Sequence, residues 1–97
     1  MPTYVLLVNW TDQGVRTARD TVDRYEASRR GLEQMGVTLS ETYWTIGPYD
    51  IVSIGEAPDD ETMTAAALAI AGEGNVRTTT LRAFNQDETR AIIAKVP

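Results

Sequence analysis

The chain has 97 residues, a hydrophobic content of 42% and a net charge of −5 at pH 7. Its length fits one domain, which we take to span residues 1–97. Because it has neither cysteine nor histidine, we expect no disulfide, no metal ion and no cofactor, and any chemistry falls to the other polar side chains. The acidic balance argues against nucleic acid and membrane surfaces as partners. No secretory leader or membrane-spanning run is recognisable, so we expect a cytoplasmic protein.

The N-terminal part of the chain predicts a strand followed by a long helix. Residues 3–10, TYVLLVNW, are mostly β-branched, leucine and aromatic residues, which favour a strand. A helix is expected from Thr11 or Asp12, either of which can cap it, to about residue 35, because apolar side chains recur at helical spacing. Gly36 suits the left-handed position that ends a helix. Within this helix the run RDTVDRYEASRR alternates acidic and basic side chains, which is typical of a solvent-exposed face.

The middle of the chain predicts a hairpin. Residues 37–46 and 49–57 are two extended runs joined at Gly47 and Pro48. So few residues separate the runs that we expect an antiparallel pair of strands. Pro58 ends the second run.

The last third of the chain predicts a helix, a strand and a second helix. The acidic residues of PDDETM favour a helix start, and TAAALAIA continues that helix to Gly72. Residues 75–84, NVRTTTLRAF, are rich in threonine and favour a strand. Asn85 is expected to cap the last helix, with Glu88 three residues later as in a capping box.

The order βαββαβα predicts an α+β protein of ferredoxin-like fold, with a four-stranded antiparallel sheet and helices on one face. A sheet covered on one side should alternate apolar and polar residues, yet YVLLV and YDIVSI place apolar side chains on both faces. We therefore expect the open face to be covered by a second copy, in a homodimer or higher oligomer with a closed space between the sheets. The alternative is that the apolar residues are merely scattered over the surface.

Tyr49 and Asp50 begin an apolar strand, where an unpaired carboxylate is costly to bury. The first and third strands are central neighbours in this fold, so both residues should lie near Trp10, Thr11 and Gln13. Asp50 either accepts hydrogen bonds from that loop and fastens the hairpin to the helix start, or lines the pocket as an acid, base or ligand contact. Tyr49 either lines the pocket or fills the core with its hydroxyl at the rim. Adjacent strand residues point to opposite faces, so the two cannot share one space without a bulge.

Four segments carry a resemblance to a known family: NWTDQG at 9–14, YWTIGPYDIV at 43–52, EAPDDET at 56–62 and GNVRTTTLRAF at 74–84. In order and spacing they resemble GYD-domain proteins, small bacterial and archaeal proteins named for a glycine, a tyrosine and an aspartate at the hairpin. The resemblance implies a ferredoxin-like subunit of the dimeric α/β-barrel type. It implies little about activity, since the family has no generally established function.

The motif positions of that family map onto Gly47, Tyr49 and Asp50, with Trp44 before the turn, Thr11, Gln13 and Gly14 at the first helix, and Arg77, Thr79, Thr80 and Arg82 in the last strand. Our ligand-binding candidates among them are Trp44, Tyr49, Thr11, Gln13 and Arg82, and our catalytic candidates are Asp50 and Tyr49. The family often has arginine or another long residue where Pro48 stands. Any ligand contact made by that side chain is absent here, and the proline stiffens the turn instead.

Three functions remain open. The favoured one is an oligomeric small-molecule binding or regulatory module with its pocket between the sheets. The second is a cofactor-free enzyme acting on a small apolar or aromatic substrate, with Asp50 or Tyr49 transferring the proton. The lack of histidine leans against an enzyme, although a buried carboxylate can be tuned as a base. The third is an assembly protein whose interface is its function. RNA binding is not expected, because the basic and second aromatic residues of the RNA-recognition strand are missing.

Overall fold

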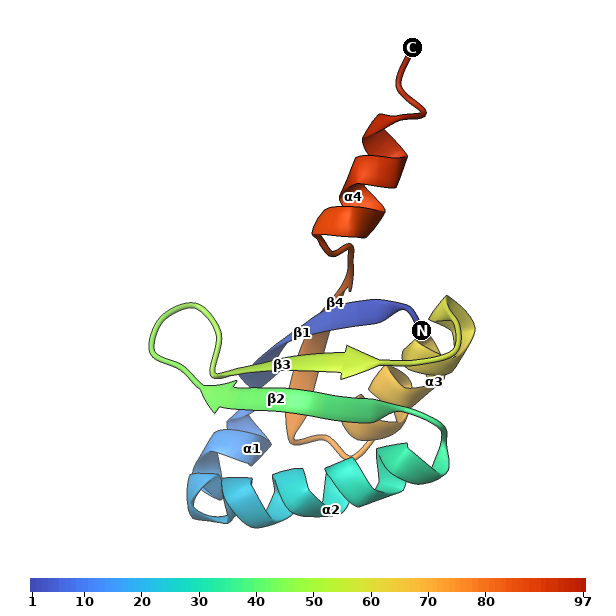
Figure 1. Cartoon of the computed structure of the whole chain (residues 1–97). Helices are drawn as coiled ribbons and strands as arrows, with labels where there is room; N and C mark the ends of the chain where they lie inside the picture. The colour runs from blue at the N-terminus through green and yellow to red at the C-terminus, as the bar shows by residue number, and fades with distance from the viewer.

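The computed structural model describes all 97 residues and shows one sheet with three of its helices on one side (Figure 1). The elements in chain order are β1 (Thr3–Trp10), α1 (Asp12–Arg16), the single 3-10 turn η1 (Ala18–Asp20), α2 (Thr21–Gln34), β2 (Thr38–Trp44), β3 (Ile51–Glu56), α3 (Asp60–Ala71), β4 (Val76–Ala83) and α4 (Gln86–Ile93). The strands pair in the order β2-β3-β1-β4, and every pair is antiparallel. This confirms the predicted α+β ferredoxin-like fold. None of the helices is both long and apolar enough to cross a membrane.

The prediction of one continuous helix from residue 11 to residue 35 is wrong, because the chain breaks after α1. Thr17 leaves the helical conformation with φ −115° and ψ 36°. Gly14 is pressed against the backbone of Asn75, where a Cβ atom would lie 1.9 Å from the carbonyl oxygen. The short helix α1 is therefore fixed to the end of the sheet, and the chain must turn before α2 can run beneath the strands.

The hairpin has the predicted antiparallel pairing, but its strands are shorter than expected. Between Trp44 and Ile51 runs a loop of residues 45–50, in which Gly47 has φ +123°. The Thr45 amide donates to the Asp50 carbonyl oxygen at 2.9 Å and closes the loop at its base. The six-residue loop thus determines where β2 ends and where β3 begins.

The core lies between the sheet and the helices. Tyr4, Leu6 and Val8 of β1 point to this side and pack with a cluster drawn from β3, the helices and the loops: Leu32, Val37, Ile51, Ala57, Met63 and Ala66. The alternate residues of β1 therefore point to the opposite, open face. No helix covers that face in Figure 1.

The open face carries apolar residues on all four strands, with Glu41, Arg77 and Thr79 on the edge strands beside them. The apolar residues that alternate with the core positions and lie in register on this face are Val5, Leu7, Tyr43, Val52, Ile54 and Leu81. Tyr43 is 59% exposed and Leu81 46% exposed, and the other four are half-buried. We call these six residues the open-face patch.

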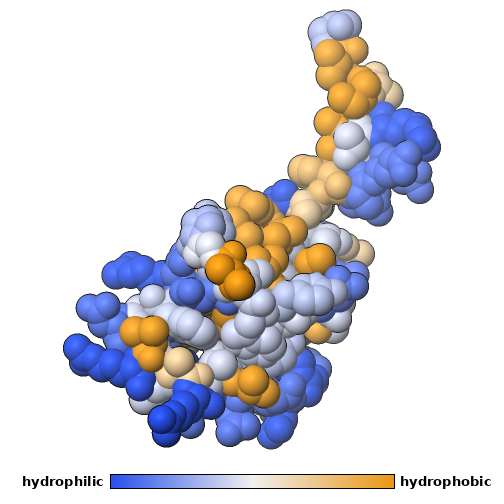
Figure 2. Space-filling view, turned by 90° about the vertical axis from the view of Figure 1, so that its left-hand side faces the viewer, coloured by the Kyte–Doolittle hydropathy of each residue, from blue (hydrophilic) through white to orange (hydrophobic).

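Helix α4 extends away from the body of the molecule (Figure 1). Its start confirms the predicted capping box, because the Asn85 side chain accepts from the Glu88 amide and the Glu88 side chain accepts from the Asn85 amide. Figure 2 shows hydrophobic residues along one side of α4 and over the part of the body nearest to it. Ile92 and Ile93 contribute to this exposed apolar side.

Candidate functional site

Asp50 holds the end of β1 to the start of β3. Its carboxylate oxygen Oδ2 accepts a hydrogen bond from the Trp10 amide at 2.9 Å. Its own amide donates to the Val8 carbonyl oxygen at 2.9 Å. Both contacts reach across about forty residues of sequence, so this one side chain and its backbone join the hairpin loop to the C-terminal end of β1.

Tyr49 is half-buried beside Asp50. Its carbonyl oxygen accepts a hydrogen bond from the Thr45 hydroxyl at 2.6 Å, and this contact within the loop stabilises its conformation. Neither Tyr49 nor Asp50 belongs to the lining of a cavity.

Thr11 and Gln13 bind the loop between α3 and β4. The Thr11 hydroxyl donates to the Gly74 carbonyl oxygen at 2.6 Å and accepts from the Gly14 amide at 3.1 Å, which caps α1. The Gln13 amide nitrogen donates to the Asn75 side-chain oxygen at 3.0 Å. These two residues therefore fasten the start of α1 to the entry of β4.

Trp44 lies on the helix side of β2 and faces α2. Its indole nitrogen donates to the Thr21 hydroxyl at 3.0 Å. Its ring meets the Tyr25 ring edge to face, with 5.5 Å between the centroids. Trp44 pairs with Ile51, which in turn pairs with Val8, so it lies at the same end of the sheet as Asp50.

Arg82 lies at the other end of the sheet, where it pairs with Tyr4 near the start of β1. Thr11 follows the end of that strand, and seven residues of strand span about 23 Å. The structure therefore brings Thr11, Gln13, Trp44, Tyr49 and Asp50 to one end of the sheet and leaves Arg82 at the opposite end.

A polar cluster surrounds Arg82 and joins β4 to the start of α3. The Tyr4 hydroxyl donates to Asp60 Oδ1 at 2.5 Å, and the Arg82 guanidinium lies 4.0 Å from the same oxygen. The guanidinium also stacks over the Phe84 ring at 4.5 Å. Burial, reinforced by the hydrogen bond to the Asp60 carboxylate, raises the pKa of Tyr4 from 10.0 to about 12. Tyr4 is thus a neutral donor that ties the central strand to α3.

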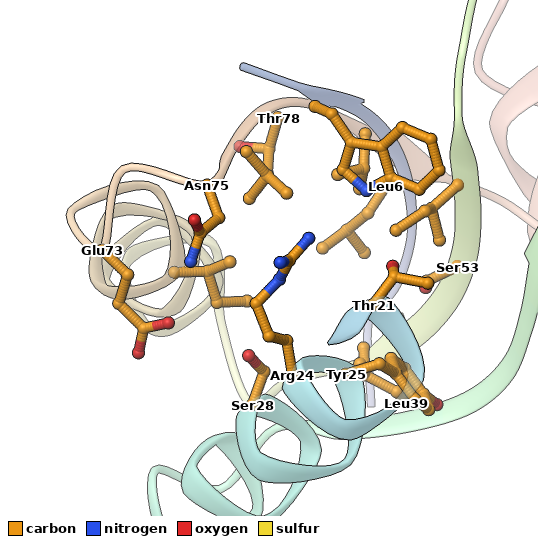
Figure 3. A pocket seen from close by; sticks show the side chains of 15 residues that line it. Leu6, Thr21, Arg24, Tyr25, Ser28, Leu39, Ser53, Glu73, Asn75 and Thr78 are labelled. Carbon is orange, nitrogen blue, oxygen red and sulfur yellow. The ribbon is translucent and has the colours of Figure 1, made fainter. Parts of the chain in front are cut away.

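The structure also contains a cavity of about 70 Å³ on the helix side of the sheet, which the sequence did not lead us to expect (Figure 3). Its apolar floor includes Leu6, Val8, Ile51, Ile70 and Val76, and polar groups from α2 and the α3–β4 loop include Arg24, Ser28, Glu73 and Asn75. Trp10 also lines it, and its indole nitrogen is buried with no hydrogen-bond partner.

The prediction of a solvent-exposed charged face on the first helix is wrong at Arg24. This residue is half-buried, and its guanidinium donates to the carbonyl oxygens of Thr17 at 2.7 Å and Gly14 at 3.1 Å. The break between α1 and α2 exposes those carbonyl oxygens, and a cation is the natural group to bind them. A charge alternation that assumes one continuous helix could not reveal this inward position.

No three acidic side chains lie close enough together to hold a metal ion. The fold and the contacts described above define a ferredoxin-like α+β domain with one sheet face open and a small cavity between the other face and the helices.

The family model described as "GYD domain" matches residues 4–93, and the chain belongs to that family. This confirms the resemblance seen at the hairpin. Over 85 residues the chain is 38% identical to a Thermus thermophilus protein named "Glutamine synthetase and cystathionine beta-lyase binding protein", covering 87% of this chain and 90% of that protein.

Solved structures resemble the chain as well. The crystal structure of the Thermus thermophilus protein TTHA0845 matches with a TM-score of 0.58 and 25% identity, over 88% of this chain and 95% of that one. The Mycobacterium tuberculosis leucine response regulatory protein LrpA matches with a TM-score of 0.62 and 15% identity, over 88% of this chain and 51% of that one. The second likeness shows the fold alone.

Proposed function

We propose that this chain is a non-catalytic regulatory module that forms a homodimer through the open-face patch and, as a dimer, binds a metabolic enzyme. The observation that carries the proposal is the patch itself, which runs in register across four strands without a covering helix. Contiguous apolar surfaces of this kind are rare on monomers and mark sites of association. A two-fold axis lets one patch cover the other.

The dimensions of the sheet favour a contribution from α4. Four strands and about six paired residues give a face of about 19 by 20 Å, or about 400 Å². A stable interface buries about 800 Å² per partner, so the sheet alone supplies about half of that area. Ile92 and Ile93 of α4 are exposed, and Figure 2 shows the apolar side of α4 beside an apolar part of the body. We therefore include α4 in the dimer interface, where it reaches over the partner subunit.

The proposed enzyme partner is supported by the relative that is 38% identical and is named for its binding of glutamine synthetase and cystathionine beta-lyase. The likeness covers nearly the whole of both chains, so the relative has little extra chain outside the matched region. Catalysis has weaker support, because Asp50 and Tyr49 are engaged in contacts within the loop and line neither cavity.

The test measures mass and enzyme binding together. Light scattering of the wild type should give twice 10.7 kDa, and Ile54→Lys should give the monomer mass because a charge is placed in the patch. Leu68→Lys is the matched control, since Leu68 is 68% exposed on α3 and lies away from the patch. The control should stay dimeric.

Enzyme binding is measured with purified glutamine synthetase and cystathionine beta-lyase immobilised on a sensor surface. The wild type and Leu68→Lys should bind at least one of the two enzymes, and Ile54→Lys should bind at least about tenfold more weakly. A wild type of 10.7 kDa at micromolar concentration would contradict the dimer. A dimer that binds neither enzyme would contradict the proposed partner and leave the dimer intact.

A further inference from the structure

We propose that the cavity between α2 and the sheet is a binding site for a small monocarboxylate with a short aliphatic chain. The cavity lies on the helix side of the sheet, opposite the open-face patch. The inference is therefore independent of the proposed dimer and enzyme partner, and it concerns a different set of residues.

The cavity is lined by one unpaired hydrogen-bond donor. Trp10 lines the cavity, and its indole nitrogen Nε1 is buried without a hydrogen-bond partner; it is the only buried side-chain nitrogen or oxygen in this state. Buried donors are almost always paired, because burial removes their hydrogen bonds to water. An acceptor that enters the cavity would pair this donor.

The cavity is also lined by a cation that has no anionic partner. Arg24 makes no ion pair, and its guanidinium lies in the middle of the cavity view in Figure 3. Three of its N–H groups donate to Thr17 and Gly14 oxygens. A guanidinium has five N–H donors, so two remain available. A carboxylate offers two oxygens with about four acceptor positions, enough to accept from the guanidinium and the indole together.

The floor and volume of the cavity define the rest of the ligand. Leu6, Val8 and Ile51 from the sheet, with Ile70 and Val76, form an apolar floor suited to an aliphatic chain. A water molecule needs about 10–15 Å³ of such volume, so a cavity of about 70 Å³ holds about five to seven non-hydrogen atoms. This is the size of a four- or five-carbon acid.

The experiment uses the two indole N–H signals of the ¹⁵N-labelled protein, one from Trp10 and one from Trp44. Trp44→Phe assigns them by removing one signal. The probes are 3-methylbutanoate and its neutral analogue 3-methylbutan-1-ol. Ligands of this size bind with dissociation constants of about 1 mM when their contacts are good. We expect 3-methylbutanoate to shift the Trp10 signal with such a constant, and the alcohol to bind at least about tenfold more weakly.

Two variants test the assigned contacts. Arg24→Gln should weaken 3-methylbutanoate at least about tenfold and leave the alcohol unchanged. Arg24 also supports the break between α1 and α2, so a second variant is needed. Thr78 of β4 lines the cavity, and Thr78→Leu should fill the cavity, keep Arg24 and Trp10, and abolish the shift. The proposal is overturned if 3-methylbutanoate at about 10 mM leaves the Trp10 signal unmoved, as a cavity that holds only water would, or if acid and alcohol bind equally.

Discussion

Replacing Asp50 by alanine tests the junction between the hairpin and the central strand. The substitution removes the acceptor of the 2.9 Å hydrogen bond from the Trp10 amide. An amide at the end of a strand is then left without its partner in a half-buried position. Hydrogen bonds to charged groups contribute about 1.5–3 kcal/mol, and partial exposure places this one at the lower end. We expect Asp50→Ala to lower the free energy of unfolding by about 1.5 kcal/mol, which is about 6–12 °C in Tm for a domain of this size.

Asp50→Asn is the matched control, because it keeps an acceptor oxygen and removes only the charge. It should cost less than half as much as alanine. Urea denaturation is followed by tryptophan fluorescence at one fixed protein concentration, since the stability of a dimer depends on concentration. A midpoint for Asp50→Ala equal to that of the wild type would refute the structural role of Asp50. Loss of ligand binding at unchanged stability would instead support the role of Asp50 in a binding or catalytic site.

Two further predictions concern Gly14 and Tyr4. Gly14→Ala should destabilise the fold by about 2–3 kcal/mol in the same denaturation assay, because its Cβ atom would lie 1.9 Å from the Asn75 carbonyl oxygen. Gly31→Ala, where nothing lies within 4 Å, should stabilise α2 by about 0.5–1 kcal/mol, and equal effects at both sites would contradict the close approach. Tyr4 has a folded-state pKa of about 12 against 10.0 in the unfolded chain, so its contribution to stability is complete below pH 10 and lost as the pH rises towards 12. Absorbance titration should show one late tyrosine that Asp60→Asn shifts to lower pH, and four tyrosines titrating together near pH 10 would refute the buried hydrogen bond.

The strand order and most helix ends could be predicted because local signals specify them. Asn85 and Glu88 form their capping box within four residues of chain, and Gly36 adopts φ +86° at the end of α2. The alternation of YVLLV places Leu6 and Val8 on one face and Val5 and Leu7 on the other, as a period of two requires. These signals need no knowledge of distant contacts.

The break in the first helix could not be predicted, because its causes are distant in sequence. Gly14 meets Asn75, sixty-one positions away, and Arg24 binds the carbonyl oxygens released by the break. The apolar spacing of the segment continues through residue 17, so the pattern alone indicates one helix.

The face on which Trp44 lies and the presence of the cavity could not be predicted from the sequence either, because both depend on contacts between separate elements. The pairing of β2 with β3 shifts between Leu39 and Glu41, so that Leu39 and Thr42 both face the helices. Such a bulge reverses the face of every later residue in the strand. Trp44 consequently faces α2, and its indole nitrogen donates a hydrogen bond to the Thr21 hydroxyl. The cavity follows from how α2 packs over the sheet, which periodicity does not specify.

The most direct test of the proposed assembly is a filtered NOE experiment on a mixture of ¹³C-labelled and unlabelled protein, which detects only contacts between two copies. The dimer predicts intermolecular contacts among the methyl groups of Val5, Leu7, Val52 and Ile54, and between these methyl groups and the Tyr43 ring. Contacts from Ile92 or Ile93 of α4 to the partner should accompany them. The absence of any intermolecular contact, or contacts confined to the helix side around Leu68, would contradict the claim that the open sheet face joins two copies of this chain.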